Sequence, residues 1–175
     1  HKAKHMAARF GFSASTCDPQ AVLQDPEIQA VLIATRHDTH GAYVASAISA
    51  GKHVFVEKPL CLNLGELQTI LDAHTKNPVG VQVGFNRRFS QHSQKLYQAL
   101  NALPGPRFLN YRINAGTLPL NHWLKDPQIG GGRIKGEVCH FVDLSLWLVS
   151  RRALRLSAFA PSGPQSEDVS VSIAF

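Results

Sequence analysis

Residues 30–60 read AVLIATRHDTHGAYVASAISAGKHVFVEKPL, and this stretch decides the fold. It holds two continuous apolar runs, VLIA at 31–34 and VFV at 54–56, on either side of a segment with helical periodicity. Continuous apolar runs of this length are typical of strands that are buried on both faces of a parallel sheet. A helix between two such strands forms a βαβ unit, so the stretch predicts a parallel sheet with a right-handed crossover.

Helix start signals extend the same alternation in both directions. Asp18 stands before a proline, a pair that favours a helix N-terminus, and Asp38 is the expected cap of the helix between the two strands. Asn63 and Glu66 have the spacing of a capping box, which predicts another helix ahead of a third strand at 79–84.

The second half of the chain has a different pattern. Its predicted elements are two helices, at 90–102 and 132–149, and three strands, at 107–113, 154–159 and 169–175. The last strand alternates apolar and polar residues, which indicates a half-buried antiparallel sheet. We therefore expect an α/β fold: a partial doubly wound, parallel, Rossmann-like domain in residues 1–88, followed by an α+β domain with a mostly antiparallel open sheet in residues 89–175.

The composition is that of an ordinary globular chain. Its 175 residues are 44% hydrophobic and 17% charged, which excludes the disordered and coiled-coil classes. No apolar run approaches the ~20 residues that a membrane span needs. The 18 basic residues exceed the 12 acidic ones but are scattered, so we expect a small-molecule partner and neither nucleic acid nor a membrane.

The cysteine and histidine patterns argue against a metal site. Cys17, Cys61 and Cys139 form no paired motif, which favours reduced thiols in a cytoplasmic protein over zinc or a disulfide framework. His37 and His40 lack the carboxylate–histidine pattern of a metal site, so no metal is expected. The chemistry is therefore sought among other polar residues.

Polar residues follow each of the three predicted parallel strands. The segments are TRHDTH at 35–40, EKP at 57–59 and NRR at 86–88. In open parallel sheets ligands bind where the strands end, so these segments predict a shared site at one edge. Lys58 is the sharpest candidate because the following proline fixes its turn, and the alternative is a solvated lysine paired with Glu57.

A second set of candidates lies in the predicted helix 132–149 and in the loop before it. Glu137 and His140 share one helix face, next to a glycine run at 130–132. A neutral histidine there is able to accept a proton from an alcohol, whereas the alternative is a buried histidine bonded to a backbone carbonyl. Trp123, in the loop, is expected to line a substrate pocket or to fill the core.

Four segments follow one another in a recognisable order. They are VLIATRHDTH at 31–40, AGKHVFVEKPL at 50–60, VGFNRRF at 83–89 and NHWLKDPQIGGGRIKGEVCHFVDL at 121–144. Together they resemble the glucose-fructose oxidoreductase, inositol dehydrogenase and MocA (Gfo/Idh/MocA) family. The resemblance implies a Rossmann domain that binds NAD or NADP, and a second domain whose open sheet often forms the interface of a homo-oligomer. It also implies hydride transfer between the nicotinamide and a hydroxyl-bearing carbon of a sugar or polyol.

The resemblance further assigns roles to individual residues. Lys58 would lie beside the nicotinamide and the reacting oxygen, with a cis peptide bond to Pro59, and His140 would exchange the hydroxyl proton. The family's acid position falls on Gly136, and the neighbouring Glu137, the candidate for that catalytic role, is rotated by ~100° on the helix. The positions carried over to the cofactor side are Thr35, Arg36, His40, Glu57, Lys58 and Arg87, and those on the substrate side are Trp123 and His140.

The chain departs from the family in two further ways. Arg36 and His37 stand where the family has proline and asparagine, and no G-x-G-x-x-G turn precedes the predicted helix at 2–10. We therefore expect an internal segment of a longer protein, a truncated module with weak or absent dinucleotide binding of its own. The alternative hypothesis is a non-catalytic binding or assembly domain that keeps the oxidoreductase fold.

Overall fold

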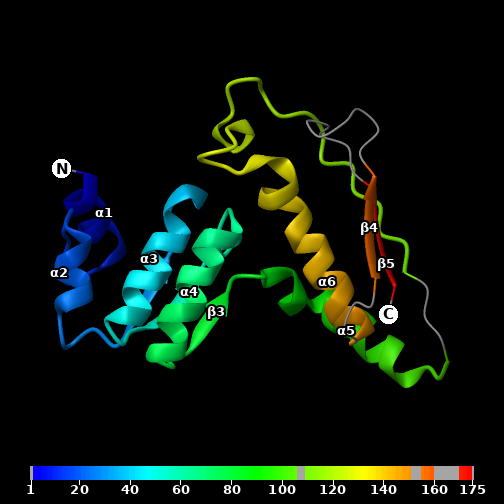
Figure 1. Ribbon diagram of the computed structural model, residues 1–175, viewed down its shortest axis with the longest axis horizontal. Helices are drawn as coiled ribbons and strands as arrows, with labels where there is room; N and C mark the ends of the chain where they lie inside the picture. The colour runs from blue at the N-terminus through cyan, green and yellow to red at the C-terminus, as the bar shows by residue number, and fades with distance from the viewer. Residues whose placement is uncertain (1, 106–108, 151–154, 160–169, 175) are drawn as a thin grey trace.

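The computed structural model describes residues 2–105, 109–150, 155–159 and 170–174. The first group of elements is α1 (Lys2–Phe10), α2 (Pro19–Gln24), β1 (Ala30–Ile33), α3 (His37–Ser49), β2 (His53–Val56), α4 (Leu64–Lys76) and β3 (Val81–Val83). The second is η1 (Asn86–Phe89), α5 (Gln91–Ala102), η2 (Trp123–Lys125), η3 (Ile134–Val138), α6 (Cys139–Val149), β4 (Arg155–Phe159) and β5 (Ser170–Ala174). The two groups lie side by side, with α6 between α4 and the β4–β5 pair (Figure 1).

The strands of the first group form a parallel sheet in the order β1-β2-β3. Helices α3 and α4 pack on each other and on one face of this sheet, and the core lies between them. Its buried side chains are Ile33, Val44, Ala45, Ala47, Ile48, Val54, Val56 and Ile70. Each large apolar side chain that is fully buried contributes roughly 1.5–3 kcal/mol, so this cluster is the main stabilising feature of the first group. The predicted βαβ arrangement is confirmed.

The opposite face of the parallel sheet is open among the described residues. Leu32 and Phe55 point to this face and are 70% and 37% exposed, whereas the adjacent Ile33 and Val56 are buried. The expectation that the strands are buried on both faces is therefore wrong for the described part of the chain. The apolar runs indicate that both faces of the sheet are suited to burial, but none of the described elements covers Leu32.

Two of the expected helix caps are confirmed. Asp18 accepts the Gln20 amide at 2.9 Å at the start of α2, and Asn63 accepts the Glu66 amide at 2.9 Å at the start of α4. The Glu66 carboxylate in turn accepts the Leu62 amide at 2.8 Å. These bonds satisfy amides that the helices leave without internal partners.

The expected cap at Asp38 is wrong. Helix α3 begins one residue earlier, at His37, and no side chain caps it. The Asp38 amide instead donates to the Ile129 carbonyl at 3.0 Å. A loop of the second group thus provides the hydrogen-bond acceptor for an amide at the start of α3. Because this acceptor is distant in sequence, local sequence patterns do not predict it.

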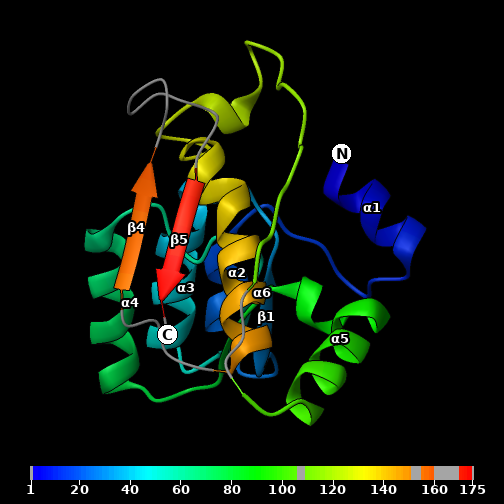
Figure 2. The same cartoon turned by 90° about the vertical axis from the view of Figure 1, so that its right-hand side faces the viewer.

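The second group contains a short antiparallel sheet and a strand prediction that fails. Strands β4 and β5 pair antiparallel, and they lie beside α6, while α1 stands apart from the other helices (Figure 2). The last two predicted strands are confirmed where they fall on described residues. The predicted strand at 107–113 is wrong, because residues 109–113 form no strand and 107–108 lie outside the described residues. Tyr111 instead packs edge-on against Phe141 of α6, with ring centroids 5.3 Å apart.

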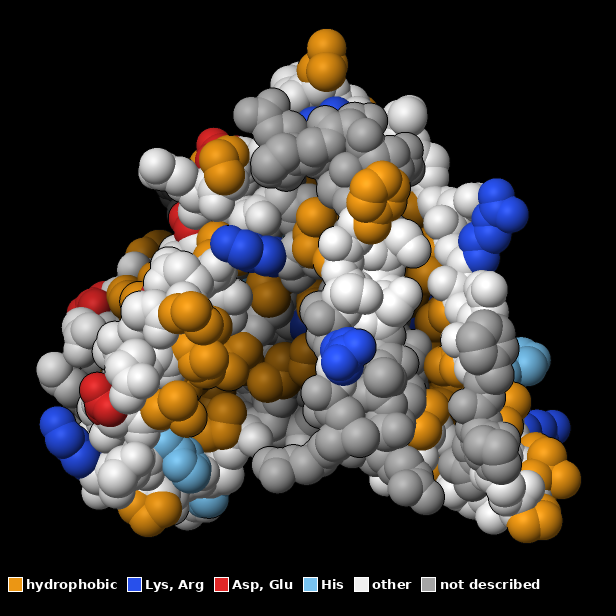
Figure 3. Space-filling model, turned by 45° about the vertical axis from the view of Figure 1, so that its right-hand side comes forward, with side chains coloured by type: hydrophobic (Ala, Val, Ile, Leu, Met, Phe, Trp, Pro, Cys, Tyr) orange, Lys and Arg blue, Asp and Glu red, His pale blue; other side chains and the backbone are white. Residues whose placement is uncertain are grey.

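The predicted helix at 132–149 is present but interrupted. A π-helical turn, η3, comes first, and regular α-helix begins only at Cys139. A π turn holds one more residue than an α turn, so side chains before it do not keep the faces that α-helical spacing assigns. Within the described ranges, no helix is long and apolar enough to cross a bilayer. On the face drawn in Figure 3, hydrophobic side chains gather around a hollow between the two groups of elements.

Candidate active site

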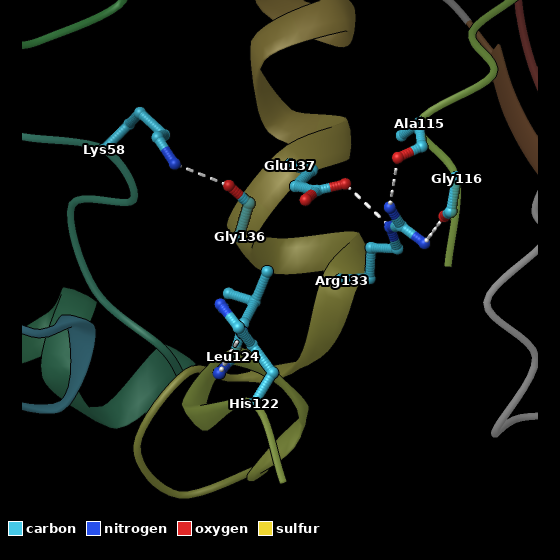
Figure 4. A network of polar contacts seen from close by, with 8 residues as sticks. All are labelled: Lys58, Ala115, Gly116, His122, Leu124, Arg133, Gly136 and Glu137. Carbon is cyan, nitrogen blue, oxygen red and sulfur yellow. Dashed lines mark hydrogen bonds and ion pairs between the residues drawn. The ribbon is translucent and has the colours of Figure 1, made fainter. Parts of the chain in front are cut away.

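A hydrogen bond between the two halves of the chain lies at the centre of the site. Lys58 lies just after β2, and its peptide bond to Pro59 is cis. The Lys58 Nζ donates a hydrogen bond to the Gly136 carbonyl at 2.7 Å (Figure 4). Gly136 lies in the π turn directly ahead of α6, which carries His140. The edge where the parallel strands end therefore faces the start of the histidine-bearing helix.

His140 is poised as a neutral imidazole. Its Nδ1 atom is shut off from solvent and has no hydrogen-bond partner among the described residues. Burial, followed by the Lys58 ammonium and the Arg87 guanidinium, lowers the pKa of His140, while Glu57 and Asp143 act in the opposite direction. A neutral ring with a lone pair is able to accept a proton from an alcohol.

The segment after β3 holds α6 in place. The Phe85 ring meets His140 edge-on, with centroids 6.2 Å apart, and Arg87 lies over the Phe141 ring with its Cζ 4.7 Å from the centroid. Arg88 makes a bidentate ion pair with Asp143, a buried carboxylate one turn beyond His140. The expected cofactor-side residue Arg87 is thus brought next to His140. The ion pair between Arg88, which lies in the predicted segment 86–88, and Asp143 joins this segment to α6.

The structure does not bring Glu137 to Lys58. The Glu137 carboxylate is paired with Arg133, whose Nε donates to it at 2.7 Å. Arg133 also donates to the carbonyls of Gly116 and Ala115, at 2.5 Å and 3.2 Å. Figure 4 shows Glu137 pointing to this side of the turn and Lys58 lying on the other. The rotation expected for Glu137 is therefore present, and its carboxylate is directed to Arg133.

Residues Thr35 and His40 form a rigid support beneath the strand ends. His40 is fully buried, and its Nδ1 and Nε2 atoms lie 2.7 Å and 3.1 Å from the carbonyl oxygens of Pro59 and Thr35. The Thr35 hydroxyl shares a 2.7 Å hydrogen bond with Thr39. His40 thus ties the turn after β1 to the turn that carries Lys58, rather than presenting a free nitrogen to a ligand.

Cationic and aromatic side chains surround Trp123 at the rim of the site. The Arg36 guanidinium lies over its ring, 5.7 Å from the centroid. The His37 ring meets it edge-on at 4.8 Å, and the His122 ring lies roughly parallel at 5.9 Å. The structure therefore brings Arg36 and Trp123 together, and it adds His37. His37 lies in the polar segment 35–40 that was predicted to contribute to the site, although no role was assigned to it there.

The last cofactor-side candidate, Glu57, lies between the ends of β1 and β3. Its amide donates to the Ile33 carbonyl at 2.8 Å. Gly84 leaves space beside it, because a Cβ atom at Gly84 would come within 3.2 Å of the Glu57 carboxylate. Together with its effect on the pKa of His140, this position places Glu57 on the same side of the molecule as Lys58.

The fold and this arrangement define a dinucleotide-type α/β protein, in which polar side chains gather where parallel strands end. Residues 1–85 match a family described as an oxidoreductase family with an NAD-binding Rossmann fold, GFO_IDH_MocA. The chain belongs to this Gfo/Idh/MocA family.

Curated relatives of known name are similar over most of this chain. It is 35% identical over 148 residues to myo-inositol 2-dehydrogenase from Thermotoga maritima, which covers 83% of the chain and 43% of the relative. It is 31% identical over 158 residues to levoglucosan dehydrogenase from Pseudarthrobacter phenanthrenivorans, covering 84% of the chain and 40% of the relative. The chain therefore spans less than half the length of these relatives.

Solved structures agree with this result. A levoglucosan dehydrogenase in complex with NADH and levoglucosan matches with a TM-score of 0.81 and 27% identity, over 99% of this chain and 52% of that one. A probable dehydrogenase from Thermotoga maritima matches with a TM-score of 0.73 and 25% identity, over 91% of this chain and 48% of that one. The predicted fold class, a partial Rossmann-like sheet followed by an antiparallel pair, is confirmed.

Proposed function

We propose that this chain has the function of an NAD(P)-dependent oxidoreductase that acts on a hydroxyl-bearing carbon of a sugar or polyol. One observation carries the proposal: Lys58 bonds to Gly136 in the turn that leads into α6, and its ammonium acts electrostatically on the His140 ring of that helix. At the reacting oxygen of an alcohol, a neutral imidazole is able to accept the proton and an ammonium is able to stabilise the developing negative charge. The sugar and polyol dehydrogenases among the relatives support the substrate class.

The residues present fit a nicotinamide cofactor. The unpartnered Nδ1 of His140 is a buried polar atom that lacks a ligand, and it lies beside the edge where such cofactors bind in parallel sheets. Thr35, Arg36, Glu57 and Arg87 would hold the cofactor side, and either NAD or NADP is compatible with them. When bound, the nicotinamide supplies the acceptor for the hydride that leaves the substrate carbon.

Residues of the chain itself would accept the hydroxyl proton and stabilise the negative charge on the reacting oxygen. His140 would accept the hydroxyl proton, so that a carbonyl forms as the C–H electron pair leaves. Lys58 would donate a hydrogen bond to the same oxygen and stabilise the negative charge that develops there. Trp123 would form a wall of the substrate pocket, and His40 would hold the turns on which Thr35 and Lys58 lie.

The alternative is a binding or assembly domain without redox chemistry. Gly136 carries no side chain at the position of the family's acid, and Glu137 is engaged by Arg133, which favours this alternative. Titration of the chain with NADH and with NADPH, followed by cofactor fluorescence, separates the two hypotheses. Saturable binding, however weak, that is lost in Lys58→Ala supports the oxidoreductase, whereas binding that survives this substitution supports the alternative.

We further propose a domain division, an assembly and a location. The division lies between residues 88 and 89, where η1 leaves the parallel sheet and meets α6. A second copy of the chain would cover the open sheet face at Leu32, giving a homo-oligomer. Three free thiols, on Cys17, Cys61 and Cys139, support a reducing, cytoplasmic location.

A further inference from the structure

His37 is a histidine near Lys58 to which the proposed function assigns no role. It is the first residue of α3 and is 6% exposed. Its Nδ1 lies 2.8 Å from the Gly130 carbonyl oxygen, and its ring meets Trp123 edge-on at 4.8 Å. Two segments from the second half of the chain therefore hold the ring in one orientation.

The bond to Gly130 decides which nitrogen of His37 is free. A carbonyl oxygen only accepts, so Nδ1 must carry the hydrogen, and Nε2 of the neutral ring keeps its lone pair. Among the described residues, Nε2 has no partner and is not one of the polar atoms shut off from solvent. It is therefore a hydrogen-bond acceptor that keeps some access to solvent on a buried ring.

The charges around His37 favour the neutral form. Burial is the largest effect that lowers its pKa, and Lys58 and His40 act in the same direction. The bond to Gly130 and the Asp38 carboxylate oppose them. The acceptor at Nε2 is thus available at neutral pH.

Gly136 places His37 next to Lys58. The Lys58 ammonium bonds to the Gly136 carbonyl, and a Cβ atom at Gly136 would lie 3.2 Å from His37 Cε1. The same Cβ would come within 2.4 Å of Leu124 Cδ1, so a side chain at this position would require the Leu124 side chain to shift. With Glu137 directed to Arg133, His37 is the acceptor that the structure offers on this side of Lys58.

We propose that His37 is a specificity-determining residue whose Nε2 accepts a hydrogen bond from a second hydroxyl of the substrate, next to the hydroxyl held by Lys58. The inference rests on the proposed function and narrows its substrate class to polyols with neighbouring hydroxyls. An alcohol without the second hydroxyl would leave this acceptor unpaired and would bind more weakly.

Two substitutions separate this role from a purely structural one. His37→Asn keeps a donor near the Nδ1 position, able to reach Gly130, but has no atom at Nε2. His37→Gln places an acceptor near Nε2 but loses the donor to Gly130. The matched control is His74→Asn on α4, since His74 also bonds a backbone carbonyl, that of Val79 at 2.9 Å, away from the site.

The experiment measures binding of myo-inositol and of levoglucosan to the 175-residue chain by calorimetry, with NADH present at the saturating level found by fluorescence. We expect His37→Asn to weaken polyol binding at least 10-fold, His37→Gln to recover part of it, and His74→Asn to match the wild type. NADH binding should be equal in all four proteins.

The other outcomes of this experiment contradict the proposed role of His37. Polyol binding that is unchanged in His37→Asn, or lost only in His37→Gln, means that His37 has a structural role alone. A wild type that binds NADH but neither polyol also overturns the role of His37, while the cofactor part of the proposed function stands. A wild type that binds no NADH overturns the role of His37 in this chain, whereas the proposed function, for which weak or absent NADH binding by this chain is expected, stands.

Discussion

At the scale of single residues, the two site histidines link stability to pH. Burial lowers the pKa of His140 and of His37 in the folded chain. The unfolded chain, in which histidine titrates near ~6.5, therefore binds more protons than the folded chain just below that pH. Their contribution to stability is complete above about pH 6.5 and is lost as the pH falls through the lower, folded-state values.

The prediction is a pH-dependent free energy of unfolding. Urea unfolding of the wild type should show lower stability at pH 5.5 than at pH 7.5. His140→Gln should flatten this dependence, because the substituted side chain does not titrate. An identical slope in the wild type and in His140→Gln would contradict the account.

Gly130 offers a second prediction at this scale. A Cβ atom there would lie 2.3 Å from the Leu124 Cα and 2.5 Å from its carbonyl oxygen, so backbone must move. We expect Gly130→Ala to lower the free energy of unfolding by about 1–3 kcal/mol, as overpacking does, and to disturb the bond to His37.

The matched control for Gly130 is Gly65 in α4. A Cβ atom at Gly65 meets only Asn63 Oδ1, at 3.3 Å, and alanine favours a helix by up to ~1 kcal/mol over glycine. Gly65→Ala should therefore be neutral or stabilising in thermal unfolding. Equal losses in the two variants would refute the steric argument.

At the scale of elements, the segment after β3 and helix α6 act as one unit. The ion pair between Arg88 and Asp143 joins them, and the Asp143 carboxylate also raises the pKa of His140. Arg88→Ala would leave that buried carboxylate without its partner, at a cost on the order of 1–3 kcal/mol in chemical unfolding. Arg88→Lys should lose less, since it keeps the charge but not the bidentate geometry.

Asp143→Asn tests the same unit through a different measurement. Removing the carboxylate leaves burial, Lys58 and Arg87 to act on His140, so its pKa should fall further. NMR titration of the His140 ring, assigned with His140→Gln, measures this change directly. A pKa that stays constant or rises in Asp143→Asn would show that the helix moved or that the carboxylate does not reach the ring.

The sequence correctly predicted those helices and strands whose apolar side chains pack against other elements of the first half of the chain. Strands β1 to β3 and helix α3 were predictable because their core is formed by segments close in sequence. The strand expected at 107–113 failed because Leu109, Tyr111 and Ile113 alternate without pairing, and Tyr111 packs on α6 instead. Alternating apolar and polar residues indicate that one side of a segment is apolar, but they do not indicate which element packs against that side.

The site was predictable only in part, for a related reason. Lys58 and His140 follow from motif and spacing, whereas the orientation of Glu137 depends on a π turn that helical spacing does not reveal. His37 and Arg88 gain their importance from partners 93 and 55 residues away. Such contacts belong to the tertiary structure, and a single sequence carries no local signal for them.

At the scale of the whole molecule, the open face of the parallel sheet predicts self-association. Leu32 is 70% exposed, and its strand, β1, pairs only with β2 among the described residues. An uncovered apolar face next to an unpaired strand edge favours a second copy of the chain. Sedimentation velocity over a concentration series should show a dimer that Leu32→Lys shifts towards monomer, because burying the ammonium is costly. The matched control is Leu120→Lys, at a leucine that is 93% exposed away from the sheet and should leave the dimer intact. A wild type that sediments as a monomer throughout, or equal effects of the two substitutions, would exclude this face as the interface.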